Sequence, residues 1–146
     1  GTVLNTGLLP ADLKQLIAHV ASTASGCQYC QAHTGHQAVH KGVTKEKLTA
    51  AFDFKTSDLF SDAEKAALDV ALHGGTSPSG IEPAHMQTLL NHFSEREAVE
   101  IISVISLFGF LNRWNDSLAT TLESAPLEFA ETTLSKTGWS PGKHQT

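Results

Sequence analysis

The side chains of this chain that could do chemistry are concentrated around its two cysteines. Cys27 and Cys30 are separated by two residues, and several histidines follow closely. Apolar residues recur at helical spacing up to Ala24, and Gly26 then interrupts the pattern. The next segment is suited to a helix that ends near Gly42. We therefore predict that Cys27 to Cys30 form the first turn of a helix.

The first turn of a helix has backbone N–H groups without partners and the positive end of the helix dipole. Both favour a thiolate over a thiol, and the thiolate is the nucleophile. Two cysteines at positions i and i+3 of such a turn can also close a disulfide without rebuilding the backbone. The pattern therefore favours reversible redox chemistry.

Two other interpretations of the cysteines stay open. A buried free cysteine packs as a small hydrophobic residue, so the pair could be structural and inert. Cys27, Cys30, His33 and His36 also resemble a zinc ligand set. On one helix each three-residue step turns by about −60°, so these four side chains cannot converge on a tetrahedral ion. We expect no metal, although a two-ligand partial site completed from elsewhere remains an alternative.

Almost every segment around this motif has a helical pattern. We predict an all-α fold of about six helices in a single domain, residues 1–146, with a core of about 9–122 and an irregular C-terminal tail of 123–146. Besides the helix that begins with Cys27 to Cys30, the expected helix starts carry a proline, a capping residue or a capping box, at Pro10, Thr44, Ser61, Pro83 and Ser94. No strand-like alternation interrupts them.

The last of these helices is expected to be the longest, running to about Leu122. From Ile101 to Leu111 it is apolar nearly all round, which is typical of a helix buried on several sides, within a subunit or between subunits. The most apolar run of the chain, Ala98 to Leu111, contains Glu100 and is too short to span a membrane, which takes about 20 apolar residues.

Composition excludes several classes of function. The net charge is −5, and the ten Lys and Arg residues are scattered, so nothing indicates binding to nucleic acid. One close pair of cysteines is not the disulfide framework of a small secreted protein. No signal peptide is visible, and we expect a cytoplasmic protein in a reducing compartment.

A family resemblance rests on Gly26-Cys27-Gln28-Tyr29-Cys30-Gln31-Ala32-His33 between two helices, and on the later segment from Phe108 to Asp116. Together they resemble the alkyl hydroperoxidase D-like, or carboxymuconolactone decarboxylase-like, family, in a peroxidase-related branch with a Cys-x-x-Cys motif. The resemblance covers about residues 9–122. It implies an AhpD-like helical fold, assembly into a trimer or hexamer through long helices, and thiol-dependent peroxidase activity.

The resemblance also assigns roles to individual residues. Cys30 matches the cysteine that attacks the peroxide, and Cys27 matches its resolving partner. The family's proton relay uses a glutamate where this chain has Gln15 and a histidine where it has Thr34. An amide and a hydroxyl do not titrate, so this relay is not intact here.

Other residues are candidates for a relay or a pocket. His33 lies close enough to Cys30 on the predicted helix to act as its base or charge partner. His19, one turn after Gln15, could replace the missing acid or simply be a hydrogen-bonded, half-buried histidine. Tyr29 could shape access to the thiols or only pack. Polar residues at the end of the long helix could line the thiol pocket or bond between helices: Asn112, Arg113, Asn115 and Asp116. The remaining histidines are expected at the surface: His73, His85, His92 and His144.

Two hypotheses about function follow. The first is an alkylhydroperoxidase-like enzyme without a cofactor beyond its own Cys27–Cys30 disulfide, which reduces hydroperoxides and is reset by a thioredoxin-like or lipoyl-type dithiol. The second is a non-catalytic helical oligomer or small-ligand binder whose cysteines are structural or sense oxidation. The cysteine positions and the nearby His33 favour the first, whereas Gln15 and Thr34 favour the second; we expect the enzyme.

Overall fold

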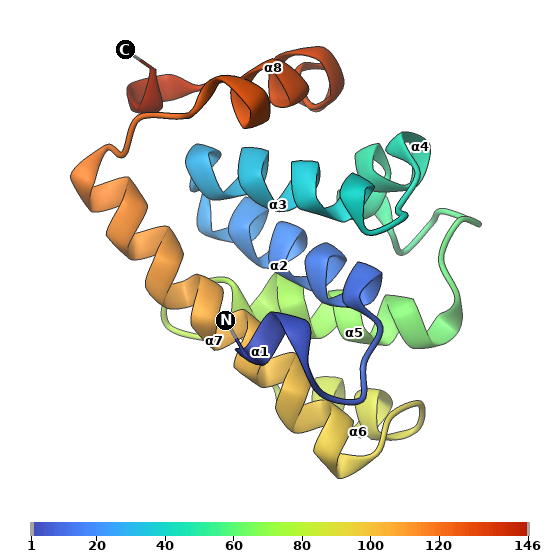
Figure 1. Cartoon of the computed structure of the whole chain (residues 1–146). Coiled ribbons are helices and arrows are strands. Elements are labelled where there is room, and N and C mark those ends of the chain that lie inside the picture. The colour runs from blue at the N-terminus through green and yellow to red at the C-terminus, as the bar shows by residue number, and fades with distance from the viewer. Residues whose placement is uncertain (1, 146) are drawn as a thin grey trace.

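The computed structural model describes residues 2–145, and every regular element in that range is a helix (Figure 1). The predicted all-α fold is confirmed. The α-helices are α1 (Thr2–Asn5), α2 (Ala11–Ser25), α3 (Gln28–His40), α4 (Lys45–Thr49), α5 (Asp62–Gly74), α6 (Pro83–Leu90), α7 (Glu95–Leu118) and α8 (Ser124–Thr133). Three short 3-10 helices complete the chain: η1 (Ala51–Asp53), η2 (Ser135–Thr137) and η3 (Gly142–His144).

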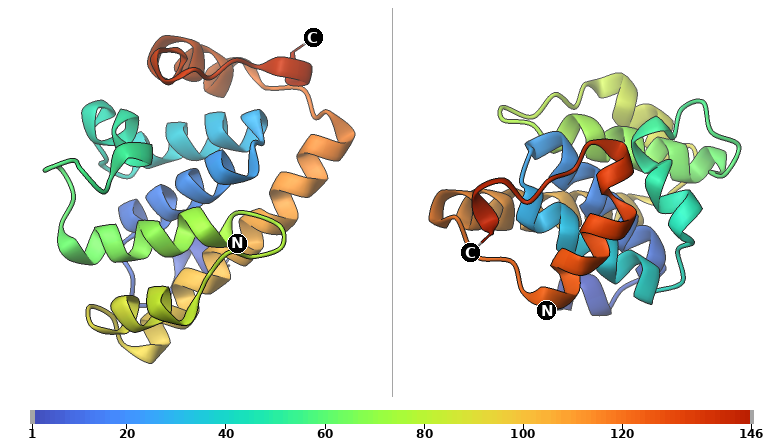
Figure 2. Two further views of the ribbon diagram at one scale, coloured as in Figure 1. Left: turned by 180° about the vertical axis from the view of Figure 1, so that it is seen from behind. Right: turned by 90° about the horizontal axis from the view of Figure 1, so that it is seen from above.

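Helix α2 is the centre of the core. It packs against α3, α5 and α7, which lie around it in both the front and the rear view (Figures 1 and 2). Ile17, Ala18 and Val20 in its middle are completely buried. Burying apolar surface in this way is the main favourable contribution to folding. The helix that precedes the cysteines is therefore the best-anchored element of the molecule.

The helix starts follow the capping signals of the sequence. The side chains of Thr44, Ser61 and Ser94 each accept a hydrogen bond from the backbone N–H three residues later. Pro83 occupies the first turn of α6, where a missing N–H costs nothing. These contacts satisfy backbone donors that no helical carbonyl can reach.

The C-terminal segment is not the irregular tail that we predicted. Residues Ser124–Thr133 form α8, which packs on α3 and lies above it in Figure 1. Pro126 does not break this helix, because it stands within the first turn of α8, where proline removes no intrahelical hydrogen bond. Beyond α8 the indole of Trp139 donates to the carbonyl of Gln28, at 3.0 Å. The chain end is thereby fixed next to the cysteines.

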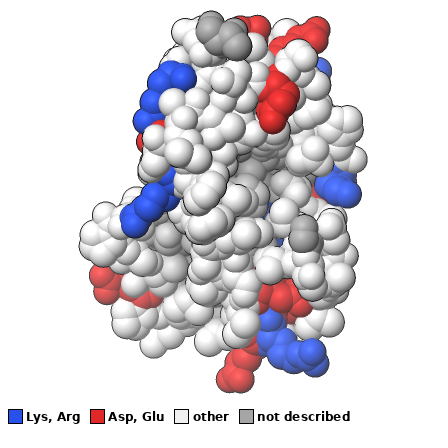
Figure 3. All heavy atoms as spheres, turned by 60° about the vertical axis from the view of Figure 1, so that its left-hand side comes forward, with Lys and Arg blue, Asp and Glu red and all other residues white. Residues whose placement is uncertain are grey.

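Helix α7 is buried on one side only. Ile101 and Val104 face the core and are completely buried. On its other side large apolar residues are more than half exposed: Val99 (66%), Phe110 (61%), Trp114 (56%) and Leu118 (62%). Figure 3, which brings this side of the molecule forward, shows a broad surface with few charged side chains. Among residues 2–145 no helix combines the length and the apolar character needed to cross a membrane.

Candidate functional site

The junction between α2 and α3 places the cysteines. Gly26 ends α2 with a φ of 80°, in the left-handed region that glycine adopts without steric cost. Its N–H donates to the carbonyls of Ser22 and Thr23, and the N–H of Cys27 donates to Ser22. The chain therefore turns sharply from the anchored α2 into α3, with Cys27 at the turn.

Cys27 is the N-cap residue of α3. Its Sγ accepts a hydrogen bond from the backbone N–H of Cys30, at 3.4 Å. Cys30 lies in the first turn, and its Sγ is 3.8 Å from Nδ2 of Asn115 on α7. Both cysteines are almost completely buried and carry free thiols. The predicted position of the pair at the start of a helix agrees with this geometry.

The two thiols have unequal surroundings. The hydrogen bond from the Cys30 thiol lowers the pKa of Cys27; burial opposes this, and the N–H of Cys30 adds to it. The pKa of Cys30 is raised by the same hydrogen bond to Cys27 and by burial. The N-cap position at the positive end of the helix therefore favours a thiolate on Cys27 over a thiolate on Cys30.

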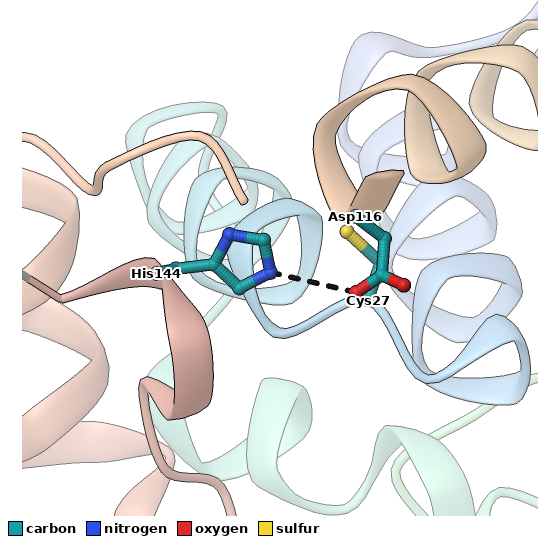
Figure 4. Close-up of side chains that lie close together, drawn as sticks. All are labelled: Cys27, Asp116 and His144. Atoms are coloured by element: carbon teal, nitrogen blue, oxygen red, sulfur yellow. Dashed lines mark ion pairs between the residues drawn. The ribbon is translucent and has the colours of Figure 1, made fainter. Parts of the chain in front are cut away.

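Two residues from distant parts of the chain meet Cys27. Asp116 comes from the last turn of α7 and His144 from η3 (Figure 4). Sγ of Cys27, a carboxylate oxygen of Asp116 and a ring nitrogen of His144 all lie within 4.8 Å of one another. Nε2 of His144 is 3.6 Å from Oδ1 of Asp116. The structure thus assembles a thiol, an imidazole and a carboxylate.

The prediction that His144 is a surface residue is wrong. Its side chain is completely buried, and Nδ1 is 2.9 Å from the carbonyl of Thr120. His144 was missed because its contact with Cys27 joins residues that lie far apart in the sequence. A hint in the sequence was Trp139, a large apolar side chain near the end of the segment that we predicted to be an irregular tail.

The positions of the family's relay lie where α2 packs against α3. Gln15 and His19 are buried on α2. Nδ1 of His19 is 3.1 Å from the hydroxyl of Thr34, and that hydroxyl donates to the carbonyl of Cys30. Burial lowers the pKa of His19 to about 4, although a hydrogen bond with the backbone of Gln31 opposes this. At neutral pH these side chains are therefore uncharged.

His33 and Tyr29 meet Glu123 rather than a sulfur. Nε2 of His33 is 2.6 Å from Oε2 of Glu123, and the Tyr29 hydroxyl donates to Oε1 at 3.0 Å. The His33 and Tyr29 rings are 4.4 Å apart. Burial and the Glu123 carboxylate raise the pKa of Tyr29 to about 12. Glu123 was not among the predicted site residues, and the role predicted for His33 stays a prediction.

An open cleft adjoins Asp116. Its volume is about 980 Å³, and it is lined by the C-terminal half of α7, the end of α2 and the loop after α5. Asn112 lies on its wall, is 2% exposed, and has both polar atoms of its amide buried without a partner. Such an amide is free to bond a ligand, since buried polar groups are normally satisfied. The cleft is the size of pockets that hold small organic molecules.

Two groups of side chains in the described range have donors close enough together for a metal ion. One is Cys27, Asp116 and His144; the other is Asp69, His73 and His85 between α5 and α6. His73 and His85, which we expected at the surface, are partly exposed. In the second group Lys55 already lies 3.2 Å from Asp69, and the N–H of Glu82 donates to His85. The expectation of no metal stays a prediction.

The family of the chain follows from its sequence. The sequence model of the carboxymuconolactone decarboxylase family matches residues 1–73, which is half of the chain. The chain belongs to this family. The resemblance that we drew from the Cys-x-x-Cys segment is thus confirmed.

Individual proteins that are similar to this chain extend the comparison. The chain is 28% identical over 92 residues to the uncharacterized protein YnjA of Escherichia coli (strain K12), covering 63% of this chain and 50% of YnjA. It therefore spans half the length of that relative. The crystal structure of the apo debrominase Bmp8 is 40% identical, with a TM-score of 0.80, covering 86% of this chain and 67% of Bmp8.

A peroxidase-related protein shares the fold at lower identity. The uncharacterized peroxidase-related protein from Silicibacter sp. TM1040 is 21% identical with a TM-score of 0.74, covering 84% of this chain and 65% of that one. At this identity the likeness shows the fold alone. This carboxymuconolactone decarboxylase family member therefore has structural neighbours that are named for two different reactions.

Proposed function

We propose that this protein is a thiol–disulfide oxidoreductase that reduces hydroperoxides with the dithiol of Cys27 and Cys30. The observation that carries the proposal is the position of Cys27 as N-cap of α3, with Cys30 one turn on and close to its sulfur. In the reaction one thiolate attacks the peroxide, the second thiol closes the disulfide, and the products are an alcohol and water. An external dithiol of thioredoxin-like or lipoyl type then restores both thiols.

The proposal is tested first on the cysteines themselves. Mass spectrometry after thiol alkylation should find no label after peroxide treatment and two labels, appearing together, after reduction. Cys27→Ser and Cys30→Ser should each reduce steady-state peroxide consumption, measured with a panel of dithiols, to the background rate. Two thiols that still label fully after peroxide treatment would favour the alternative of a non-catalytic helical assembly.

A second candidate substrate is an aromatic halide. It is favoured by the 40% identity to the debrominase Bmp8. A cysteine-to-alanine variant of that debrominase was crystallised with 2,3,4-tribromopyrrole, and its structure matches this chain with a TM-score of 0.82. The open cleft beside Asp116 has room for an aromatic ring. Here the dithiol and the carbon–bromine bond would give a disulfide, a carbon–hydrogen bond, bromide and a proton.

The two substrates are separated by one comparison. The reduced protein is given an alkyl hydroperoxide or 2,3,4-tribromopyrrole, and disulfide formation is followed together with alcohol or bromide release. Faster oxidation by the hydroperoxide supports the first substrate, and stoichiometric bromide release supports the second. Asn112→Ala should weaken binding of the organic substrate in the cleft while leaving the reaction of the thiols with hydrogen peroxide unchanged.

A further inference from the structure

We infer that Cys27 is the attacking thiolate and that His144 is its proton acceptor, held by the carbonyl of Thr120 and the carboxylate of Asp116. This rests on the proposed function and reverses the order of the cysteines that the resemblance implies. It adds a residue of the C-terminal segment to the reacting centre.

The hydrogen bonds of His144 fix its tautomer. A backbone carbonyl can only accept, so Nδ1, at 2.9 Å from Thr120, carries a proton. In the neutral ring Nε2 then has a free lone pair, and this atom is buried without a hydrogen-bond partner. Nε2 faces Asp116, with Cys27 alongside (Figure 4). A buried imidazole nitrogen that is left unpaired next to a thiol is placed to take its proton.

The charges around this nitrogen favour the transfer. When the proton moves from Cys27 to Nε2, the imidazolium lies between two negative groups, the thiolate and Asp116. Lys143, the neighbour of His144, binds the second oxygen of Asp116 at 3.1 Å. The Asp116 carboxylate by itself disfavours a thiolate on either cysteine. An imidazolium between them reverses that effect, because an opposite charge at about 4–6 Å stabilises the anion.

The proton balance of the reaction closes within this group. Cys27 gives its proton to His144, and the thiolate attacks the outer oxygen of the hydroperoxide to form a sulfenic acid. The imidazolium returns its proton to the alkoxide that leaves. The Cys30 thiol then displaces water from the sulfenic acid to form the disulfide. The separation of up to 4.8 Å is bridged through one water molecule or by rotation of the thiol.

The experiment measures the thiolate, not turnover, so it does not depend on the substrate. In a Cys30→Ser background the ultraviolet absorbance of the Cys27 thiolate is followed against pH. His144→Gln keeps a donor for Thr120 but cannot become cationic, and it should leave about tenfold less thiolate at a pH below the pKa of Cys27. His92→Gln, at an exposed histidine, is the matched control and should change nothing. The other titratable groups around His144, Asp116 and Tyr29, are the same in all variants.

The same samples report whether the chain end stays in place. With Trp114→Phe in the background, the remaining tryptophan is Trp139, whose indole bonds to Gln28, so its fluorescence shows whether the segment is docked. Unchanged thiolate titration in a docked His144→Gln variant overturns the inference. Stoichiometric zinc in the purified protein that is lost in the variant also overturns it, because His144 would then be a metal ligand.

A second measurement keeps the test valid if the variant undocks. In the unsubstituted protein, NMR of the His144 ring should show that it binds its second proton at a higher pH in the dithiol form than in the disulfide form. The same titration in both forms overturns the inference. Loss of all turnover with normal thiolate titrations would count against the proposed function only.

Discussion

At the scale of single residues, two identical thiols are made unequal by position. Cys27 lies before the helix and receives the N–H of Cys30, whereas Cys30 lies inside the first turn and meets the amide of Asn115. A cap position concentrates the orphan N–H groups of the helix on one sulfur. Helix position thus adds to the hydrogen bond from the Cys30 thiol in favouring the negative charge on Cys27.

His19 should make the stability of the protein depend on pH. The pKa of His19 is about 4 in the folded protein, against an ordinary value of 6.5. Between pH 6.5 and pH 4 the His19 side chain is therefore protonated in the unfolded chain but neutral in the folded protein. The contribution of neutral His19 is present above pH 6.5 and is lost as the pH falls to about 4. It amounts to about 3 kcal/mol.

Urea unfolding at neutral pH and near pH 4 measures this contribution. His19→Gln should remove most of the loss of stability on acidification, whereas His92→Gln should retain it. An identical acid dependence in both variants would mean that other groups destabilise the protein in acid.

The site residues were predictable only where the contact is local. Cys27 and Cys30 could be placed because their separation by three positions and the start of one helix determine how close their side chains lie. Asp116 and Asn112 were recognised as polar groups at the end of an apolar helix. His144 and Glu123 could not be predicted, because their partners near Cys27 and on α3 are brought to them by the fold and not by spacing in the sequence.

At the scale of elements, the capping residues made the starts of the helices from α2 to α7 predictable, and their apolar periodicity made their buried faces predictable. Helix α8 was missed because a proline near a helix start and a proline that breaks a helix look alike in sequence. Only packing against α3 selects between them. The helices from α2 to α7 could therefore be predicted from the sequence, whereas α8 could not.

The stability of the protein should be sensitive to replacement of Gly26 at the α2–α3 junction. No atom lies within 4 Å of a Cβ added there, so Gly26→Ala is opposed only by the left-handed backbone and should cost about 1 kcal/mol in urea unfolding. Gly109 also has open space around it but is helical, and Gly109→Ala should stabilise by about 0.5–1 kcal/mol. Equal effects of the two substitutions would contradict a role for the backbone angle.

At the scale of the whole molecule, the exposed side of α7 is the feature that the single chain does not explain. Large exposed apolar patches mark interaction sites in most proteins. Phe110 and Trp114 stack with their rings 5.9 Å apart on this side, and they are more than half exposed. We propose that this surface joins copies of the chain into the trimer or hexamer that the family resemblance implies.

Light scattering coupled to size exclusion tests the assembly. The unsubstituted protein should elute as a trimer or hexamer at micromolar concentration, and Phe110→Lys should shift it to smaller species. Leu59→Lys, an exposed apolar residue in the loop before α5, is the control and should leave the assembly intact. A monodisperse monomer of the unsubstituted protein would contradict the proposed interface.

Under the proposed redox function, the capping role of Cys27 would tie the reduction potential of the Cys27–Cys30 couple to the stability of α3. The sulfur is a good acceptor for the N–H of Cys30 as a thiol or thiolate and a poor one within a disulfide, so oxidation removes the cap. A lost N-cap costs about 1 kcal/mol. For a two-electron couple this favours the dithiol form by about 20 mV, since about 30 mV corresponds to 1.4 kcal/mol. A substitution elsewhere that provides α3 with a second cap should therefore make the protein a weaker oxidant without touching either cysteine.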